Sequence, residues 1–177
     1  GPTFTVTVTV NPVPSISNKT ATICSGGTFT VTPANGGTEI VPSGTTYTWT
    51  APVISPAGSI TGGSAQPTGQ TSISQALTNT SNASATATYT VTPQSGTCPG
   101  PTFTVTVTVN PVPSISNKTA TICSGGTFTV TPANGGAEIV PTGTTYTWSA
   151  PVISPAGSIT GGSAQPTGQT SISQALT

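Results

Sequence analysis

The chain repeats itself almost without change at an offset of 99 residues, because the segment that begins at Gly1 begins again at Gly100. Over the 78 positions where the two copies overlap, only three pairs differ: Thr38/Ala137, Ser43/Thr142 and Thr50/Ser149. Solenoid coils repeat roughly every 20 to 50 residues, so this period is too long for a solenoid. It indicates a whole domain that is repeated in tandem, and we call each copy a bead.

The joint between beads is expected at the motif VNPVP, which occupies residues 10–14 and again residues 109–113. Its two prolines remove amide donors and bias the chain to an extended conformation. We therefore predict that residues 1–11 are the last strand of a preceding repeat, that residues 12–110 are one complete repeat, and that residues 111–177 are a truncated second repeat. The joint itself is Asn110, Pro111 and Pro113, and its lack of glycine predicts a short, semi-rigid connection.

Apolar and polar residues alternate along the repeat, which is typical of half-buried β-strands. The clearest case is residues 102–109, where one phenylalanine and three valines share one face and threonines take the other. Weaker or shorter alternations at residues 21–23, 28–32, 47–49, 73–77 and 85–91 are separated by glycine-rich turn signals. No segment has helical spacing, so we predict an all-β fold of tandem, immunoglobulin-like antiparallel β-sandwich domains.

Large aromatic residues on the apolar faces of these strands form the predicted core, since a sandwich buries the inward face of each strand. They are Trp49, Tyr47, Phe29, Tyr89 and Phe103. Trp49 and Tyr47 could instead form an exposed platform on which sugar rings stack. Their alternation within one strand favours the core.

Charge is almost absent from the chain, and this excludes several classes of partner. The only charged side chains are Lys19, Glu39, Lys118 and Glu138, whereas 41 residues are Thr and 21 are Ser. Two lysines cannot form the basic stripe that nucleic-acid binding requires, nor the patch that attracts anionic lipid. No apolar stretch approaches the roughly 20 residues that cross a bilayer, so we expect neither nucleic-acid binding nor membrane insertion.

Catalytic groups are also missing. General acid–base chemistry needs side chains that titrate near neutral pH, and the chain has no His. Its two glutamates lie one in each copy, so they form neither a catalytic carboxylate pair nor a calcium site. We expect no enzyme activity, no cofactor and no bound metal.

Each copy combines one lysine, one glutamate and several asparagines, the ingredients of a Lys–Asn isopeptide crosslink promoted by a carboxyl group. Lys19 and Glu39 could serve in the complete repeat; the alternative is that both are solvated surface charges. Asparagines also occur in Asn-x-Ser/Thr triplets, the acceptor motif for N-glycosylation. Such triplets arise by chance in a chain that is this rich in Ser and Thr. They are Asn18, Asn79, Asn82 and Asn117.

The repeat accounts for the odd number of cysteines. Cys24 and Cys98 fall within one complete repeat, whereas Cys123 is the second copy of Cys24 and would pair beyond Thr177. We predict a Cys24–Cys98 disulfide, which would close a loop of about 75 residues, stabilise the fold by about 4–5 kcal/mol and imply an oxidising compartment. Free thiols are the alternative, and a metal site is disfavoured because no His or Asp accompanies the cysteines.

Three motifs give the chain a family resemblance: CSGGTFTVTP, TYTWTAP and ATATYTVTPQSGTCPGPTFTVTVTVNPVP. The chain resembles the PKD-like repeats of giant Bacteroidota surface proteins, of the type found in mobile gliding-motility adhesins of flavobacteria. TWTAP stands where standard PKD domains have a WDFGDG-like turn, which indicates the PKD-like branch. The resemblance implies export by a type IX system, tandem arrays and a filament on the bacterial cell surface.

A mechanical function follows as the expectation: the beads form an extracellular stalk or filament of an adhesin. Neighbouring identical repeats of the same chain are the expected partners, and lateral self-association and surface glycans are left open. Two other classes also remain open at this point. Regular threonine ladders could bind ice, and the sandwich could be a carbohydrate-binding module.

Overall fold

Every regular element of the chain is a β-strand, because Thr, Val and Ser side chains favour the extended backbone over helix interiors. The computed structural model describes residues 1–177, and the chain divides into two units, Gly1–Asn110 and Pro111–Thr177. We call these unit 1 and unit 2. No membrane-spanning helix is found in the chain.

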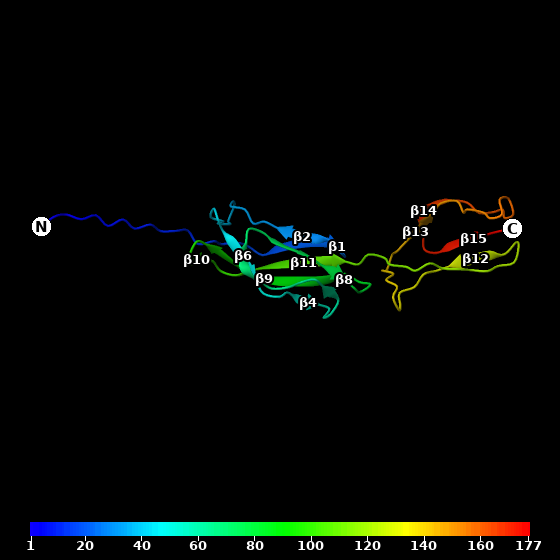
Figure 1. Cartoon of the computed structure of the whole chain (residues 1–177), viewed down its shortest axis with the longest axis horizontal. Helices are drawn as coiled ribbons and strands as arrows, with labels where there is room; N and C mark the ends of the chain where they lie inside the picture. Colours follow the sequence, from blue (N-terminus) through cyan, green and yellow to red (C-terminus); the bar gives the residue numbers. More distant parts are fainter. The chain divides into compact units, whose positions relative to one another are not determined.

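Unit 1 contains eleven strands in chain order (Figure 1). They are β1 (Lys19–Cys24), β2 (Thr28–Val31), β3 (Thr46–Trp49), β4 (Val53–Ser55), β5 (Ile60–Thr61), β6 (Gln66–Gln70), β7 (Ile73–Ala76), β8 (Thr78–Asn79), β9 (Ala85–Ser95), β10 (Cys98–Pro99) and β11 (Phe103–Asn110). One sheet has the order β1-β11-β9-β3-β6, and β4 and β10 also pair with β9. The pairs β2–β7 and β5–β8 form the opposing layer, which completes an immunoglobulin-like β-sandwich.

Strand β11 lies inside its sheet and not at an edge. It runs parallel to β1, from Lys19↔Val105 to Cys24↔Asn110, and antiparallel to β9, from Phe103↔Val91 to Val109↔Ala85. Its apolar residues therefore all face the core, and its threonines all face outward. Both rows of backbone hydrogen-bonding groups are paired, so this long Thr-Val strand offers no open edge for aggregation.

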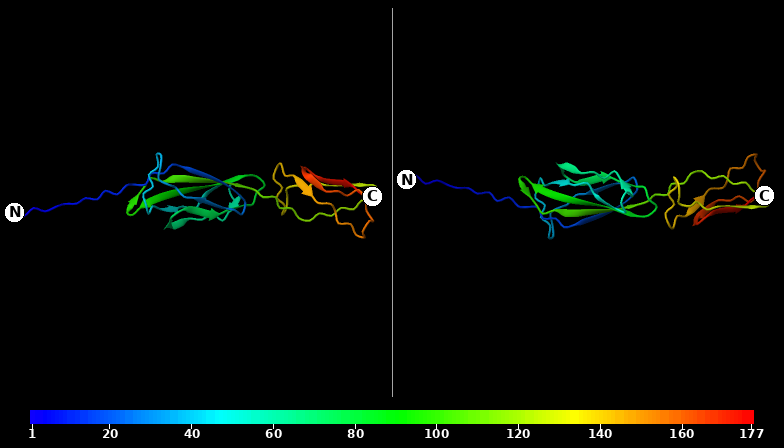
Figure 2. Two further views of the ribbon diagram at one scale, coloured as in Figure 1. Left: turned by 90° about the horizontal axis from the view of Figure 1, so that it is seen from above. Right: turned by 90° about the horizontal axis from the view of Figure 1, so that it is seen from below.

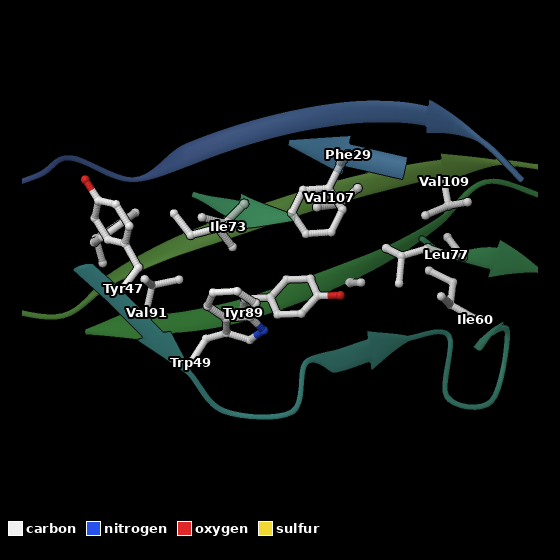
Figure 3. Close-up of a cluster of buried hydrophobic side chains, with 14 of the residues drawn as sticks. Phe29, Tyr47, Trp49, Ile60, Ile73, Leu77, Tyr89, Val91, Val107 and Val109 are labelled. Atoms are coloured by element: carbon white, nitrogen blue, oxygen red, sulfur yellow. The ribbon is translucent and has the colours of Figure 1, made fainter. Parts of the chain in front are cut away.

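The core fills the space between the two layers (Figure 3). Tyr89 of β9 lies at its centre, with its ring 5.3 Å from the ring of Phe29 on β2. Tyr47 of β3 meets Phe103 of β11 edge-on at 6.4 Å, a favourable arrangement for aromatic rings. Trp49 is buried as well, and its indole N–H donates to the carbonyl of Ser64 at 3.2 Å. All five aromatic residues that the alternation singles out thus lie in the core.

One buried polar residue closes the core at the end of the sandwich where β11 ends. The side chain of Asn79 donates to the carbonyls of Val109 and Ala83, both at 2.8 Å. Its carbonyl oxygen accepts from the backbone N–H of Ser81 at 2.8 Å and from the Ser81 hydroxyl at 2.7 Å. Every hydrogen-bonding group of this amide is satisfied, so Asn79 joins β8, the following turn and β11.

Unit 2 repeats only part of this arrangement. Its strands are β12 (Thr127–Val130), β13 (Tyr146–Trp148), β14 (Gln165–Gln169) and β15 (Ile172–Ala175), paired as β12–β15 and β13–β14 (Figure 2). These pairs match β2–β7 and β3–β6 of unit 1 residue for residue. The residues of unit 2 include no copies of β9 and β11, and its aromatic residues are only half-buried.

Two further segments have the sequence of a strand but lack its partner, and neither forms a strand. Residues 118–123 have the sequence of β1 but form no strand, because no copy of β11 lies beside them. Residues 1–11 have the sequence of Gly100 and the ten residues after it, yet residues 1–10 form no strand and run as an extended segment outside the sandwich (Figures 1 and 2). Phe4 is 87% exposed, whereas its copy Phe103 is 3% exposed.

We predict that Asn79→Ala lowers the free energy of unfolding of unit 1 by about 3 kcal/mol, because the buried carbonyl of Val109 loses the Asn79 donor and Ser81 loses its acceptor. The matched control is Asn82→Ala, an exposed asparagine three residues away, which should change stability by less than about 0.5 kcal/mol. Urea unfolding followed by Trp49 fluorescence, with Trp148→Phe in all variants, measures the difference. Equal stability of the two alanine variants would contradict the role of Asn79.

Candidate functional site

The two ends of unit 1 and its outward sheet face are the surfaces through which a repeat of this kind can act. They consist of the joint residues, the cysteines, the Lys–Glu pair and the threonines. No cluster of three or more His, Cys, Asp or Glu side chains occurs in the structure.

The joint is shorter than the VNPVP motif that marks it. Strand β11 continues to Asn110, and Ser114 already forms a bridge with Ile139 in unit 2. In unit 1, Pro14, the first copy of Pro113, is fully buried. A Cβ atom at Gly100 would lie only 2.3 Å from the carbonyl oxygen of Pro14, so the chain can pack here only because residue 100 is glycine. In a complete repeat only two residues, Pro111 and Val112 or their copies, are therefore left as linker.

The predicted Cys24–Cys98 disulfide is wrong, and the strand register explains why. All three cysteines are free. Cys24 pairs with Asn110 at the end of β1, beyond the Val109↔Ala85 pair, whereas Cys98 pairs with Ser95. The two cysteines thus lie near opposite ends of the 11-residue strand β9, about 33 Å apart at about 3.3 Å per residue. A disulfide needs Cα atoms within about 7 Å, so no small adjustment could form it.

Each lysine is paired with the glutamate of its own copy. The ammonium of Lys19 contacts the carboxylate of Glu39 at 2.5 Å, and Lys118 contacts Glu138 in the same way. The backbone N–H of Ser17 donates to Glu39 at 3.1 Å, and the Ser17 hydroxyl donates to the same carboxylate oxygen. Both side chains stay partly exposed at the surface, at 28% and 13%, and the pair fastens residues 17–19 to residue 39.

The Lys–Asn isopeptide crosslink stays an alternative hypothesis. The structure brings Lys19 and Glu39 together, but the side chain of the adjacent Asn18 accepts a hydrogen bond from the backbone N–H of Thr104 at 2.9 Å. The hydrogen bonds of Asn18 and Lys19 thus go to different groups.

Threonines cover the outward face of the main sheet. They stand opposite one another across three neighbouring strands, since β1, β11 and β9 are in a register that matches hydroxyl with hydroxyl. The matched pairs are Thr20↔Thr106, Thr22↔Thr108, Thr104↔Thr90, Thr106↔Thr88 and Thr108↔Thr86. All these side chains are exposed or half-buried, so the face is neutral and hydrated.

The sugar-stacking hypothesis for Tyr47 and Trp49 is wrong in unit 1. Both rings are buried, at 2% and 6% exposure, and the polar atom of the Trp49 ring is already bonded to Ser64. Burial also raises the pKa of Tyr89 to about 12. No aromatic platform remains on the surface of the complete repeat at these positions.

These features define a class: an immunoglobulin-like β-sandwich module that has a neutral hydroxyl face and short joints. Residues 21–113 match the family model of the PKD-like domain, which is more than half of the chain. The chain therefore belongs to the PKD-like domain family, and this part of the sequence resemblance is confirmed. PKD-like domains are typically extracellular, non-catalytic modules of structure and adhesion. A comparison with curated proteins finds no match.

The Lys19–Glu39 ion pair should make the stability of unit 1 sensitive to acid. Hydrogen bonds from the Lys19 ammonium, and then from the Ser17 hydroxyl, lower the pKa of Glu39 from 4.5 to about 2. Because the unfolded chain takes up this proton at a higher pH than the folded chain, the free energy of unfolding should fall as the pH drops from about 4.5 to about 2.

Thermal unfolding of unit 1 between pH 6 and pH 2, read through Trp49 fluorescence with Trp148→Phe, would measure this sensitivity. Glu39→Gln should flatten the decrease in Tm below pH 4.5, whereas Glu138→Gln, the same change in unit 2, should leave it intact. If the Tm of the Glu39→Gln variant fell with pH as steeply as that of the parent chain, Glu39 would not be the source of the acid sensitivity.

Proposed function

We propose that the complete repeat is a load-bearing spacer in an extracellular stalk or filament on a bacterial surface. The observation that carries this proposal is the parallel pairing of the first long strand with the last one. Tension enters unit 1 before β1 and leaves it after β11, so the two strands are pulled in opposite directions.

Parallel pairing makes this tension act in shear. Six residue pairs connect β1 and β11, and a pull along the strands loads all their hydrogen bonds together. Two antiparallel strands that are pulled from one end would instead separate one pair at a time. Resistance to shear is the property that a spacer under tension requires.

Three further features support the same function. A linker of about two residues keeps length proportional to the number of repeats. The neutral threonine face stays hydrated without depending on salt, since it has no charges to screen. Near-identity of the copies fits a spacer, in which no repeat has a separate task.

The finer assignment rests on the sequence resemblance. On that basis the chain is part of a giant adhesin of the gliding-motility type, exported by a type IX system, whose repeats have identical neighbours as their partners. Lateral association through the threonine face and binding of surface glycans belong to the same proposal. Ice binding by that face stays a prediction.

Pulling the chain by its two ends tests the load-bearing role. Unit 1 should unfold in a single step that releases about 30 nm of chain. The double variant Thr20→Pro, Ala21→Pro should lower the unfolding force, because alternate residues of a parallel strand donate to a given neighbour and one of the two prolines removes a donor.

The matched control is Thr119→Pro, Ala120→Pro, the same change in the copy that forms no strand, which should leave the force for unit 1 unchanged. Near-ultraviolet circular dichroism verifies that unit 1 still folds in both variants. An unchanged unfolding force in the folded Thr20/Ala21 variant would contradict the shear mechanism.

A further inference from the structure

Residues 2–11 have the sequence of a core strand but form no strand themselves. Their sequence, PTFTVTVTVN, is identical to that of residues 101–110, which include β11. In unit 1 the apolar face of β11 is buried, whereas the same face of the first segment lies in solvent (Figure 1). The exposed side chains are Phe4, Val6, Val8 and Val10. An extended segment of this kind can add to a strand that has an unpaired edge.

Unit 2 contains a segment that lacks such a partner. Residues 118–123 are identical in sequence to β1, which pairs with β11 in unit 1, yet in unit 2 they form no strand. Two grooves lie along this segment. The first has a volume of about 410 Å³ and is lined by Lys118 together with Phe128, Tyr146 and other apolar residues. The second has a volume of about 230 Å³ and is lined by Ile122 and other residues of unit 2.

In unit 1 the corresponding places are filled by the two ends of β11. At its start, the ring of Phe103 meets that of Tyr47 at 6.4 Å, and Asn18 accepts a hydrogen bond from the backbone N–H of the next residue at 2.9 Å. At its end, the backbone N–H of Ser25 donates to the carbonyl of Asn110 at 2.8 Å. These three contacts fix both the position and the register of the strand.

The copies of the three residues that hold β11 all line the grooves of unit 2. Tyr146 and Asn117, the copies of the residues at the start, line the first groove, and Ser124, the copy of the residue at the end, lines the second. A strand with the β11 sequence would place Phe4 against Tyr146 and the carbonyl of Asn11 at Ser124. The grooves of unit 2 therefore match the sequence of residues 2–11 at both ends.

We propose that unit 2 binds residues 2–11 of a second copy of the chain, which add as a strand parallel to residues 118–123. The pairing repeats the register of β1 and β11, so that Lys118 aligns with Val6 and Cys123 aligns with Asn11. None of the three positions at which the two copies of the sequence differ lies in the donor segment or in the lining of the two grooves. This self-association goes beyond the spacer role and does not depend on it.

The donor and the acceptor are different surfaces, and each chain has one of each. The contact is therefore heterologous, and it joins chains head to tail into open filaments or rings. Because the partners are separate molecules, the joined fraction rises with protein concentration. Dilution restores the free chain, in which residues 1–10 form no strand.

Crosslinking between cysteines tests the register. The test variant combines Asn11→Cys with Cys24→Ser and Cys98→Ser, so that Cys123 is the only other thiol. Paired residues of neighbouring strands lie about 5 Å apart, within the reach of a disulfide. The control is Thr5→Cys in the same background, which puts the thiol six residues away in the donor, about 20 Å from Cys123 in the proposed pairing.

Under mild oxidation at high protein concentration, the Asn11→Cys variant should form disulfide-linked dimers and longer multimers at least about tenfold faster than the Thr5→Cys variant. Non-reducing gel electrophoresis measures the rates, and mass spectrometry of the digested dimer verifies a bond between position 11 and Cys123. Equal rates in the two variants would overturn the proposal. A bond that forms within a monomer would overturn it as well, since the donor would then not come from a second copy.

A second pair of variants tests which face of the donor enters the core. In the Asn11→Cys background, Val6→Lys should slow the crosslinking at least about tenfold, because its copy Val105 is fully buried and a lysine there would have no partner. Thr7→Lys adds the same charge on the outward face and should change the rate by less than about twofold.

Both lysines lie in a segment that forms no strand in the free chain, so the fold of the two units should not change. Circular dichroism verifies this. If the two lysines slowed the crosslinking equally, the added charge and not the docked face would be the cause, and the proposal would be overturned.

Discussion

Strand β11 pairs along most of its length with β1 on one side and along nearly all of its length with β9 on the other, and the rest of the sandwich depends on this double pairing. The strand supplies four buried apolar side chains to the core and gives β1 its only partner. Where the same sequences lack these neighbours, neither residues 1–10 nor residues 118–123 form a strand. Identical residues thus adopt different structures, because unpaired backbone groups and exposed valines gain nothing from an ordered strand in water.

The same double pairing connects fold and function. It places the first and last long strands side by side in a parallel ladder, so that tension along the chain acts across the whole ladder. It also holds Cys24 at the end where the chain leaves and Cys98 at the end where it enters. The mechanical role therefore follows from one feature of the topology of unit 1.

The sequence predicted those strands in which apolar and polar residues alternate. The stripes that contain Phe29, Tyr47, Tyr89 and Phe103 are strands whose apolar faces form the core. It missed β6, because the sequence QPTGQ contains a proline and a glycine and has no apolar face; its pairing with β3 makes it a strand. The short strand β4 was missed as well, since its three residues owe their conformation to β9.

The positions of the cysteines and the Lys19–Glu39 ion pair could not be predicted from the sequence for a related reason. The positions of the cysteines depend on strand register, and composition does not say that Cys24 aligns with Asn110 while Cys98 aligns with Ser95. The repeat correctly assigned Cys24 and Cys98 to one unit, but membership of one unit does not place two residues at the same end of it. Lys19 and Glu39 are likewise 20 residues apart and meet only through the folded backbone.

Residue-resolved amide hydrogen exchange tests the central dependence on paired neighbours most directly, because it compares two copies of one sequence in a single sample. The amides of Val105 and Val107 in β11 should exchange slowly, as interior strand amides bonded to β1 or β9 do. The amides of Val6 and Val8, their copies in the first eleven residues, should exchange at the rate of an unstructured chain. Equal protection of the two copies, or rapid exchange in both, would contradict the account.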